Sequence, residues 1–179
     1  GYSSAASDVY KRQMLNAACD SNGIRACRHI ARAAGIRGMV GGQWEDVSNE
    51  GKAISSHMLR YIHEHKTADM ITGGLMAGGA AAGAEESELS GLKAYGLNIG
   101  LAFQITDDIL DVTGSQEEMG KSLGKDAEEK KATYVALFGV DKAYQAAREH
   151  INAAKDALAA YNNTHFLVQL ADFILTRRS

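Results

Sequence analysis

A four-residue repeat of apolar side chains constrains the fold of this chain more than any other feature of its sequence. The repeat lies between residues 92 and 112, and its spacing places the apolar side chains on one face of an α-helix. Its members are Leu97, Leu101, Ile105 and Ile109. No proline occurs among the 179 residues, and 29 of them are alanine, the residue with the highest helix propensity. We therefore expect an all-α protein.

Further helices are expected on both sides of this segment. The helical patterns cover residues 14–37, 52–84, 134–137, 141–161 and 166–177. Glycines and charged residues separate these patterns. They predict a break or a close approach at residues 38–42, a charged loop at 85–90 and a longer loop at 114–131.

The length of the chain predicts one domain, and its charge predicts no strong electrostatic field at the surface. A chain of 179 residues can bury one core, and its net charge of -3 argues against nucleic-acid binding. The sequence contains no apolar run that predicts a membrane anchor. Its two cysteines fit a reduced, cytoplasmic setting. Residues 1–13 have no clear periodicity, so we interpret them as a disordered or non-native tail and residues 14–179 as the folded part.

Three carboxylates within five residues form the main candidate site. Asp107 and Asp111 lie one helical turn apart, whereas Asp108 is offset by about 100° around the helix axis. Clustered carboxylates repel one another unless a cation lies among them, and a small set of hard oxygen ligands suits Mg²⁺. A solvated acidic face near a helix end would have the same pattern.

Residues on both sides of this motif favour the metal interpretation. Gln104 lies one turn before the motif, and Gly96 and Gly100 are expected to leave the same face open as a cavity wall. A glycine-containing segment after the motif carries lysines, which include Lys121 and Lys131. Ammonium groups suit a diphosphate, although an ordinary surface loop has a similar composition. We interpret the region as a site for Mg²⁺ and a diphosphate.

Five short blocks of the sequence occur in the order found in one enzyme family. They are GGQWED at 41–46, HKT at 65–67, FQITDDILD at 103–111, MGK at 119–121 and KATY at 131–134. In these blocks the chain resembles the trans-isoprenyl diphosphate synthases, or polyprenyl synthetases, and is most similar to bacterial farnesyl diphosphate synthases. The resemblance covers residues 14–179 and implies the C-terminal half of an isoprenoid synthase-type helical bundle.

The resemblance implies a reaction and a role for each block. The reaction is the Mg²⁺-dependent head-to-tail condensation of an allylic diphosphate with isopentenyl diphosphate, which yields geranyl or farnesyl diphosphate. The implied metal ligands are Asp107, Asp108 and Asp111. The implied diphosphate contacts are Lys66, Lys121 and Lys131. The groups that would face the allylic cation are the backbone around Lys66, the Thr67 hydroxyl and the Gln104 amide. The residues that would line the substrate cavity are Gln43, Asp46 and Phe103.

The first aspartate-rich motif of that family is absent from these 179 residues. The pattern DDxxD occurs once, and residues 1–40 contain no Arg-Arg pair of the kind that binds isopentenyl diphosphate. We therefore expect the chain to be inactive alone. The resemblance also implies that the full-length protein is a homodimer. Two alternatives stay open: a non-catalytic partner subunit of an intact synthase, and a protein similar to class I terpene synthases.

Two other residue types near the blocks are interpreted as structural. His63 and His65 do not converge on one helix face, so we expect them to have structural or surface roles. Trp44 is expected to pack beside Gln43.

Overall fold

The computed structural model describes residues 19–118 and 133–177, and every regular element within these ranges is a helix. The prediction of an all-α protein is therefore confirmed. The elements are α2 (Ser21–Ala34), α3 (Met39–Ser48), α4 (Ser56–Ile62), the π-helix η1 (His63–Ala68), α5 (Asp69–Ala81), α6 (Glu86–Glu118), α7 (Tyr134–Phe138), α8 (Val140–Ala157) and α9 (His165–Thr176).

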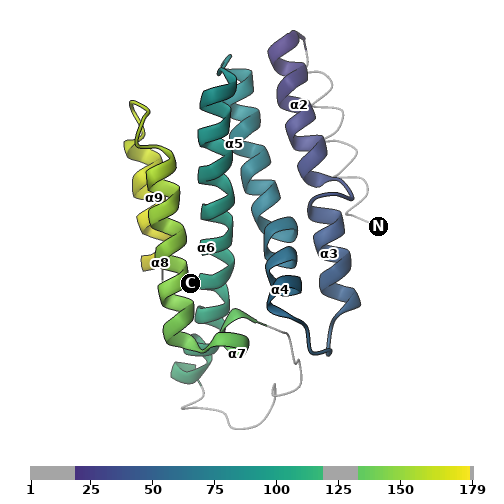
Figure 1. The fold of residues 1–179 in the computed structure, drawn as a ribbon, viewed down its shortest axis with the longest axis vertical. Helices are drawn as coiled ribbons and strands as arrows, with labels where there is room; N and C mark the ends of the chain where they lie inside the picture. Colours follow the sequence, from purple (N-terminus) through teal and green to yellow (C-terminus); the bar gives the residue numbers. More distant parts are fainter. Residues whose placement is uncertain (1–18, 119–132, 178–179) are drawn as a thin grey trace.

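The long helix α6 lies at the centre of the bundle, with α5 on one side and α8 on the other (Figure 1). Helix α2 packs against α5, and α9 packs against both α6 and α8. Helices α3 and α4 continue below α2 and α5 in the same view. The central position of α6 allows one helix to carry side chains toward both halves of the bundle.

Two clusters of buried apolar side chains lie between α6, α8 and α9. Ile105 and Ile109 of the four-residue repeat are buried against Ala143 and Ala147 of α8. Small alanine side chains let the two helices approach closely, so the longer isoleucines fill the space between them. The sequence repeat therefore predicted the buried face of α6 correctly.

Helices α4 and α5 form one continuous rod through the π-helix η1. At its end, the backbone N–H of Asp69 donates to the carbonyl of Glu64, five residues earlier, instead of four as in an α-helix. Such wide turns are rare and are frequently found at functional sites. The turn includes Lys66 and Thr67, two of the predicted site residues.

Glycines on two neighbouring helices allow the backbone of η1 to lie unusually close to them. A Cβ atom on Gly42 of α3 would lie 2.2 Å from the Lys66 backbone nitrogen. A Cβ atom on Gly100 of α6 would lie 2.4 Å from the Cα of Ala68. Of the two readings of residues 38–42, the close approach is the one found, because α3 continues through these glycines and uses Gly42 for close packing.

Helix α6 begins earlier than the sequence pattern predicted. Residues 86–90 belong to the helix and not to a charged loop. The Glu88 side chain accepts a hydrogen bond of 2.9 Å from the backbone N–H of Glu85, as in a capping box. Acidic side chains in the first turn also interact favourably with the helix dipole, so the charges stabilise a helix start. Likewise, α6 continues to Glu118 into the predicted loop at 114–131.

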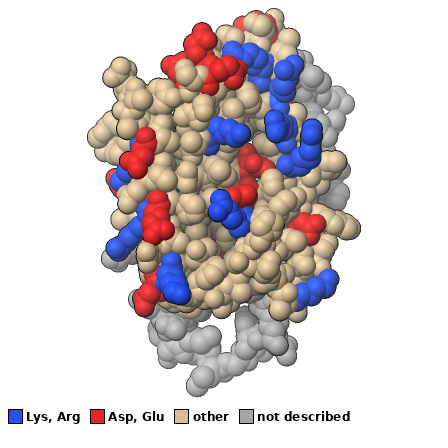
Figure 2. Space-filling view, viewed as in Figure 1, with Lys and Arg blue, Asp and Glu red and all other residues tan. Residues whose placement is uncertain are grey.

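Charged side chains at the top of the bundle connect α2 to the start of α6. Basic side chains gather over α2, with acidic side chains beside them at the top (Figure 2). Arg25 of α2 donates to the Ala84 carbonyl and to the Glu86 carboxylate, both at 3.2 Å. These contacts hold the turn between α5 and α6 against α2.

Several large apolar side chains of the described residues face solvent on α3 and α9. Trp44 is 70% exposed, and Phe166 is 72% exposed. The expectation that Trp44 packs beside Gln43 is wrong, because α3 directs that ring away from its neighbours in the bundle. Within residues 19–118 and 133–177, no helix combines the length and apolarity that a membrane span requires.

The close contact between α6 and η1 can be tested by adding a methyl group. Gly100→Ala is expected to lower the free energy of unfolding by about 1 to 3 kcal/mol, because the methyl has no free space. The measurement is urea-induced unfolding followed by circular dichroism. Gly74→Ala on α5 is the matched control, because its Cβ would meet no atom within 4 Å. The free energy of unfolding of this control is expected to rise by up to about 1 kcal/mol. The same rise in Gly100→Ala would contradict the close packing of α6 on η1.

Candidate functional site

Helix α3 and η1 place Asp46 and Lys66 in direct contact. The Lys66 ammonium donates to the Asp46 carboxylate at 2.5 Å, and both side chains are about one third exposed, at 36% and 30%. Together with Gln43 they line a cavity of about 200 Å³. The predicted association of Gln43, Asp46 and Lys66 is thus present in the structure.

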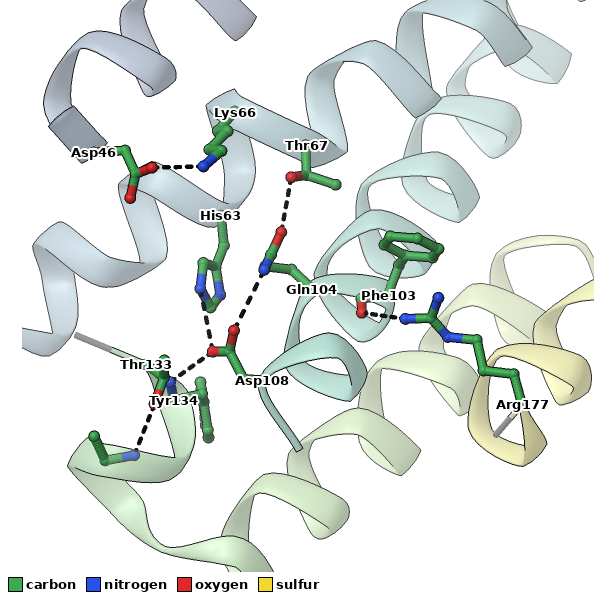
Figure 3. A network of polar contacts seen from close by, with 11 residues as sticks. Asp46, His63, Lys66, Thr67, Phe103, Gln104, Asp108, Thr133, Tyr134 and Arg177 are labelled. Carbon is green, nitrogen blue, oxygen red and sulfur yellow. Dashed lines mark hydrogen bonds and ion pairs between the residues drawn. The ribbon is translucent and has the colours of Figure 1, made fainter. Parts of the chain in front are cut away.

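A chain of side-chain hydrogen bonds connects η1 to the aspartate-rich motif on α6 (Figure 3). The Thr67 hydroxyl donates to the Gln104 side-chain oxygen at 2.9 Å. The Gln104 amide nitrogen donates to Asp108 at 3.3 Å. These two bonds fix both ends of the Gln104 amide, so its orientation follows from its partners.

Asp108 is a buried carboxylate that faces η1 and α7. Only 5% of the residue is exposed, and its Oδ2 atom accepts a hydrogen bond of 2.7 Å from the Tyr134 backbone N–H. The imidazole of His63 lies on the same side, with its Nε2 3.6 Å from Oδ2. Asp108 therefore anchors the first residue of α7 to α6.

Burial shifts the pKa values of Asp108 and His63 toward their neutral forms. Desolvation raises the pKa of Asp108 to about 6, although hydrogen bonds from Tyr134 and Gln104 oppose the change. Desolvation lowers the pKa of His63 to about 4, so the imidazole is neutral at pH 7. The separation of 3.6 Å would suit an ion pair, but the loss of water around both groups outweighs that attraction.

Asp107 lies on another face of α6 and contacts the end of α9. The Arg177 guanidinium donates to Asp107 Oδ1, and also to the Phe103 carbonyl at 3.1 Å. It lies over the Phe103 ring, 4.0 Å from the ring centre. Burial raises the pKa of Asp107, while Arg177 acts in the opposite direction. The side chains of Arg177 and Asp107 are 12% and 36% exposed.

The three carboxylates of the motif thus divide into two sets, as their angular spacing predicted. Asp108 is buried and accepts hydrogen bonds from Gln104 and Tyr134, whereas Asp107 is half-buried against Arg177 and Asp111 is exposed. Asp107 and Asp111 are close enough to influence each other electrostatically. Two carboxylates fit an Mg²⁺ ion that takes its other ligands from water and phosphate. Among the residues that the structure describes, no group of three His, Cys, Asp or Glu side chains is arranged to hold a metal.

Gly96 and Gly100 do not form an open cavity wall. A Cβ atom on Gly96 would lie 2.8 Å from the Cα of Thr72, and one on Gly100 would meet Ala68. Both glycines are buried where α6 packs against α5 and η1. Only glycine fits at these two positions, because two helix backbones approach each other there. The prediction that this face is an open cavity wall is therefore wrong.

The structure brings most of the predicted site residues into two neighbouring groups. The first group lies around η1 and comprises Gln43, Asp46, Lys66, Thr67, Gln104 and Asp108. The second lies at the end of α9 and comprises Phe103 and Asp107. Lys121 and Lys131, the other two predicted phosphate contacts, lie outside the described residues.

Two residues at the site had not been predicted. His63 lies four positions before Thr67, so a helical face shared with Thr67 was available as a signal. Arg177 lies 70 residues after Asp107, and no local pattern connects the two. Its role could be found only from the tertiary structure.

Comparison with known proteins identifies one family. A model described as polyprenyl synthetase matches residues 5–165, and this match begins inside the segment that we interpreted as a tail. The geranylgeranyl diphosphate synthase of Cyanophora paradoxa is 37% identical over 158 residues, which are 87% of this chain and 53% of that protein. The farnesyl diphosphate synthase of Geobacillus stearothermophilus is 42% identical over 132 residues, which are 74% and 44% of the two chains.

Solved structures show the same similarity. A geranyltransferase from Helicobacter pylori superposes with a TM-score of 0.77 and 28% identity, covering 97% of this chain and 57% of the other. A structure of the Helicobacter pylori geranyltransferase with magnesium and isoprenyl diphosphate gives a TM-score of 0.75 and 31% identity, with the same coverage. The chain therefore spans about half the length of the relatives that it matches.

The shifted pKa of Asp108 predicts how this residue affects stability. The folded pKa of about 6 lies above the ordinary value of 3.8, so ionisation favours the unfolded chain as the pH rises from 4 to 6. Relative to the wild type, Asp108→Asn is expected to gain about 2 kcal/mol of unfolding free energy over this range. Urea unfolding at pH 4, 5, 6 and 7 measures the difference.

The exposed Asp156 supplies a control for this measurement. Asp156→Asn makes the same chemical change at an exposed position, so it shows how much of the change in unfolding free energy any Asp→Asn substitution would give across this pH range. The amide oxygen introduced by Asp108→Asn can still accept the hydrogen bond from the Tyr134 backbone N–H, but its NH2 group would face the Gln104 amide nitrogen, which is also a donor. The cost of this mismatch does not depend on pH, so the change of stability with pH is the quantity to compare. If the unfolding free energy of Asp108→Asn relative to the wild type changed with pH no more than that of Asp156→Asn, burial would not shift the pKa of Asp108.

Proposed function

Because this chain belongs to the polyprenyl synthetase family, we propose that it forms part of a Mg²⁺-dependent prenyltransferase. The proposed reaction condenses an allylic diphosphate with isopentenyl diphosphate and gives geranyl or farnesyl diphosphate. The hydrogen-bond chain from Thr67 through Gln104 to Asp108 carries the proposal, because it joins the residues of two predicted blocks at the aspartate-rich motif. A Helicobacter pylori relative that was solved with magnesium and isoprenyl diphosphate supports the proposed ligands.

The diphosphate would bind between the carboxylates of α6 and the ammonium group of η1. Asp107 and Asp111 would hold Mg²⁺, which supplies the positive charge that a diphosphate leaving group requires. The Lys66 ammonium has three N–H donors and gives one to Asp46, so others are available for phosphate oxygens. Asp46 fixes the position of that ammonium. We propose that Asp108 supports the site mainly through Gln104 and Tyr134.

The oxygen atoms of Thr67 and Gln104 would stabilise the allylic cation. The Thr67 proton is directed toward Gln104, so the lone pairs of the hydroxyl oxygen are free to face positive charge. These dipoles are fixed before the reaction, which reduces the cost of reorganisation. The carbon–oxygen bond to the diphosphate breaks, and the double bond of isopentenyl diphosphate forms the new carbon–carbon bond. The proton that is then lost goes to the released diphosphate in this proposal, so no side chain has to act as a general base.

The carboxylates of the motif are proposed to differ in their contribution to binding. We expect Asp107→Ala and Asp111→Ala each to weaken Mg²⁺-dependent diphosphate binding by about tenfold or more, because each removes a direct charge. Asp108→Ala is expected to have a smaller effect, since its carboxylate faces protein groups. Calorimetric titration with Mg²⁺ and dimethylallyl diphosphate is the measurement. Asp156→Ala on α8 is the control, and equal losses in all three motif variants would refute the ranking.

Turnover by the chain alone is proposed to be negligible. The pattern DDxxD occurs once in the sequence, so a second metal-binding motif and the isopentenyl diphosphate site would have to come from residues outside these 179. The test incubates the purified chain with Mg²⁺, geranyl diphosphate and isopentenyl diphosphate. Robust formation of farnesyl diphosphate would contradict this prediction.

A non-catalytic partner subunit of an intact synthase is the second candidate function. The exposed apolar side chains of α3 and α9, among them Trp44 and Phe166, favour this alternative because they offer a surface for association. Both candidates predict no turnover by the chain alone. They differ in metal binding, which the prenyltransferase proposal requires and the partner proposal does not.

A further inference from the structure

Arg177 connects the end of α9 to α6 through three contacts, of which Figure 3 shows the hydrogen bond to the Phe103 carbonyl. Its guanidinium donates to Asp107 Oδ1 and to the Phe103 carbonyl, and it lies over the Phe103 ring. The Arg177 side chain is only 12% exposed. Its Nε atom is buried and has no hydrogen-bond partner among the described residues. A buried cation that contacts a proposed metal ligand calls for a functional explanation.

We propose that Arg177 is a positioning residue that holds the Asp107 carboxylate in the metal-free protein and releases it when Mg²⁺ binds. The release would also free the end of α9 from this carboxylate. This inference rests on the proposed function, because it assumes that Asp107 binds the metal ion.

The argument for displacement is competition between two cations for one carboxylate. An Mg²⁺ ion binds carboxylate oxygens at about 2.0 to 2.1 Å and demands near-octahedral geometry. Arg177 already occupies Asp107 Oδ1, and a guanidinium so close to a divalent cation would be repelled in this partly dehydrated site. Magnesium would therefore bind with the loss of the Arg177–Asp107 contact.

The remaining contacts limit how much of α9 can move. Arg177 keeps its hydrogen bond to the Phe103 carbonyl and its place over the Phe103 ring. Lys155 of α8 contacts Asp172 of α9, and Ala171 and Ile174 are buried in the core. The helix therefore stays attached to α8, and the change is confined to its last turn.

Two substitutions of Arg177 test the competition directly. The Arg177→Gln variant removes the charge and is expected to bind Mg²⁺ about fivefold more tightly than the wild type. The Arg177→Lys variant keeps a charge but cannot reproduce the planar stacking on Phe103, so an intermediate affinity is expected. The measurement is isothermal titration calorimetry with Mg²⁺ and inorganic pyrophosphate at pH 8. Unchanged or weaker binding in both variants would overturn the proposal, and the lysine variant alone decides if Arg177→Gln does not fold.

Lys155→Gln is the matched control, because it breaks a contact of α9 without affecting Asp107. Its affinity for Mg²⁺ is expected to equal that of the wild type. A gain as large as that of Arg177→Gln would show that a loosened α9, and not a released carboxylate, causes the effect. This result would overturn the proposed competition.

Hydrogen exchange provides a readout that does not depend on activity. In the wild type, Mg²⁺ with pyrophosphate is expected to increase exchange several-fold at the backbone amides of residues 174–177. In Arg177→Gln the same amides are expected to exchange quickly with or without the metal. A decrease of exchange on Mg²⁺ binding in the wild type would contradict the release of the last turn of α9.

The Asp107→Asn variant separates failure of this inference from failure of the proposed function. If the wild type binds no Mg²⁺, or if Asp107→Asn binds it equally well, both proposals fail. If binding depends on Asp107 but Arg177→Gln matches the wild type, only the role of Arg177 is overturned.

Discussion

The site depends on the close approach of three helix backbones around η1. Gly42 and Gly100 carry no side chain at the two points where α3 and α6 meet this segment. A methyl group at either point would collide with backbone atoms, which cannot move aside as a flexible side chain can. Because the backbones lie so close, short side chains such as Thr67 can reach across to α6. The packing of glycines therefore sets the geometry of the polar network.

Asp108 contributes to the fold and to the site at the same time. Its carboxylate accepts hydrogen bonds from α6 and α7, yet burial makes its ionised form costly. His63, which lies beside it, is neutral at pH 7 and does not compensate that charge. The protein thus retains a carboxylate that lowers its own stability near neutral pH. Such a cost is typical of residues that a binding site requires.

Some features could be predicted from the sequence because a repeated pattern reports which face is buried. The repeat that includes Ile105 and Ile109 predicted both a helix and its buried side. The prediction of an open cavity wall at Gly96 was wrong, because a glycine suits both an open face and a close contact between helices. Only the position of the neighbouring helix decides between the two. The start of α6 was missed, since charged residues favour loops and first helical turns alike. The contact between Arg177 and Asp107 has no sequence signal, because it arises when α9 docks on α6.

The wide turn at η1 has a consequence for the rod that α4 and α5 form. One extra residue in a helical turn rotates everything beyond it by about 100° relative to an uninterrupted α-helix. The two ends of the rod therefore present different faces: the end with η1 meets α3, and α5 meets α2. If this turn closed into a regular α-helix with all its residues kept, α5 would rotate by about 100° relative to α4. One of the two neighbouring helices would then lose its matching surface, so the wide turn is what lets both helices pack on the same rod.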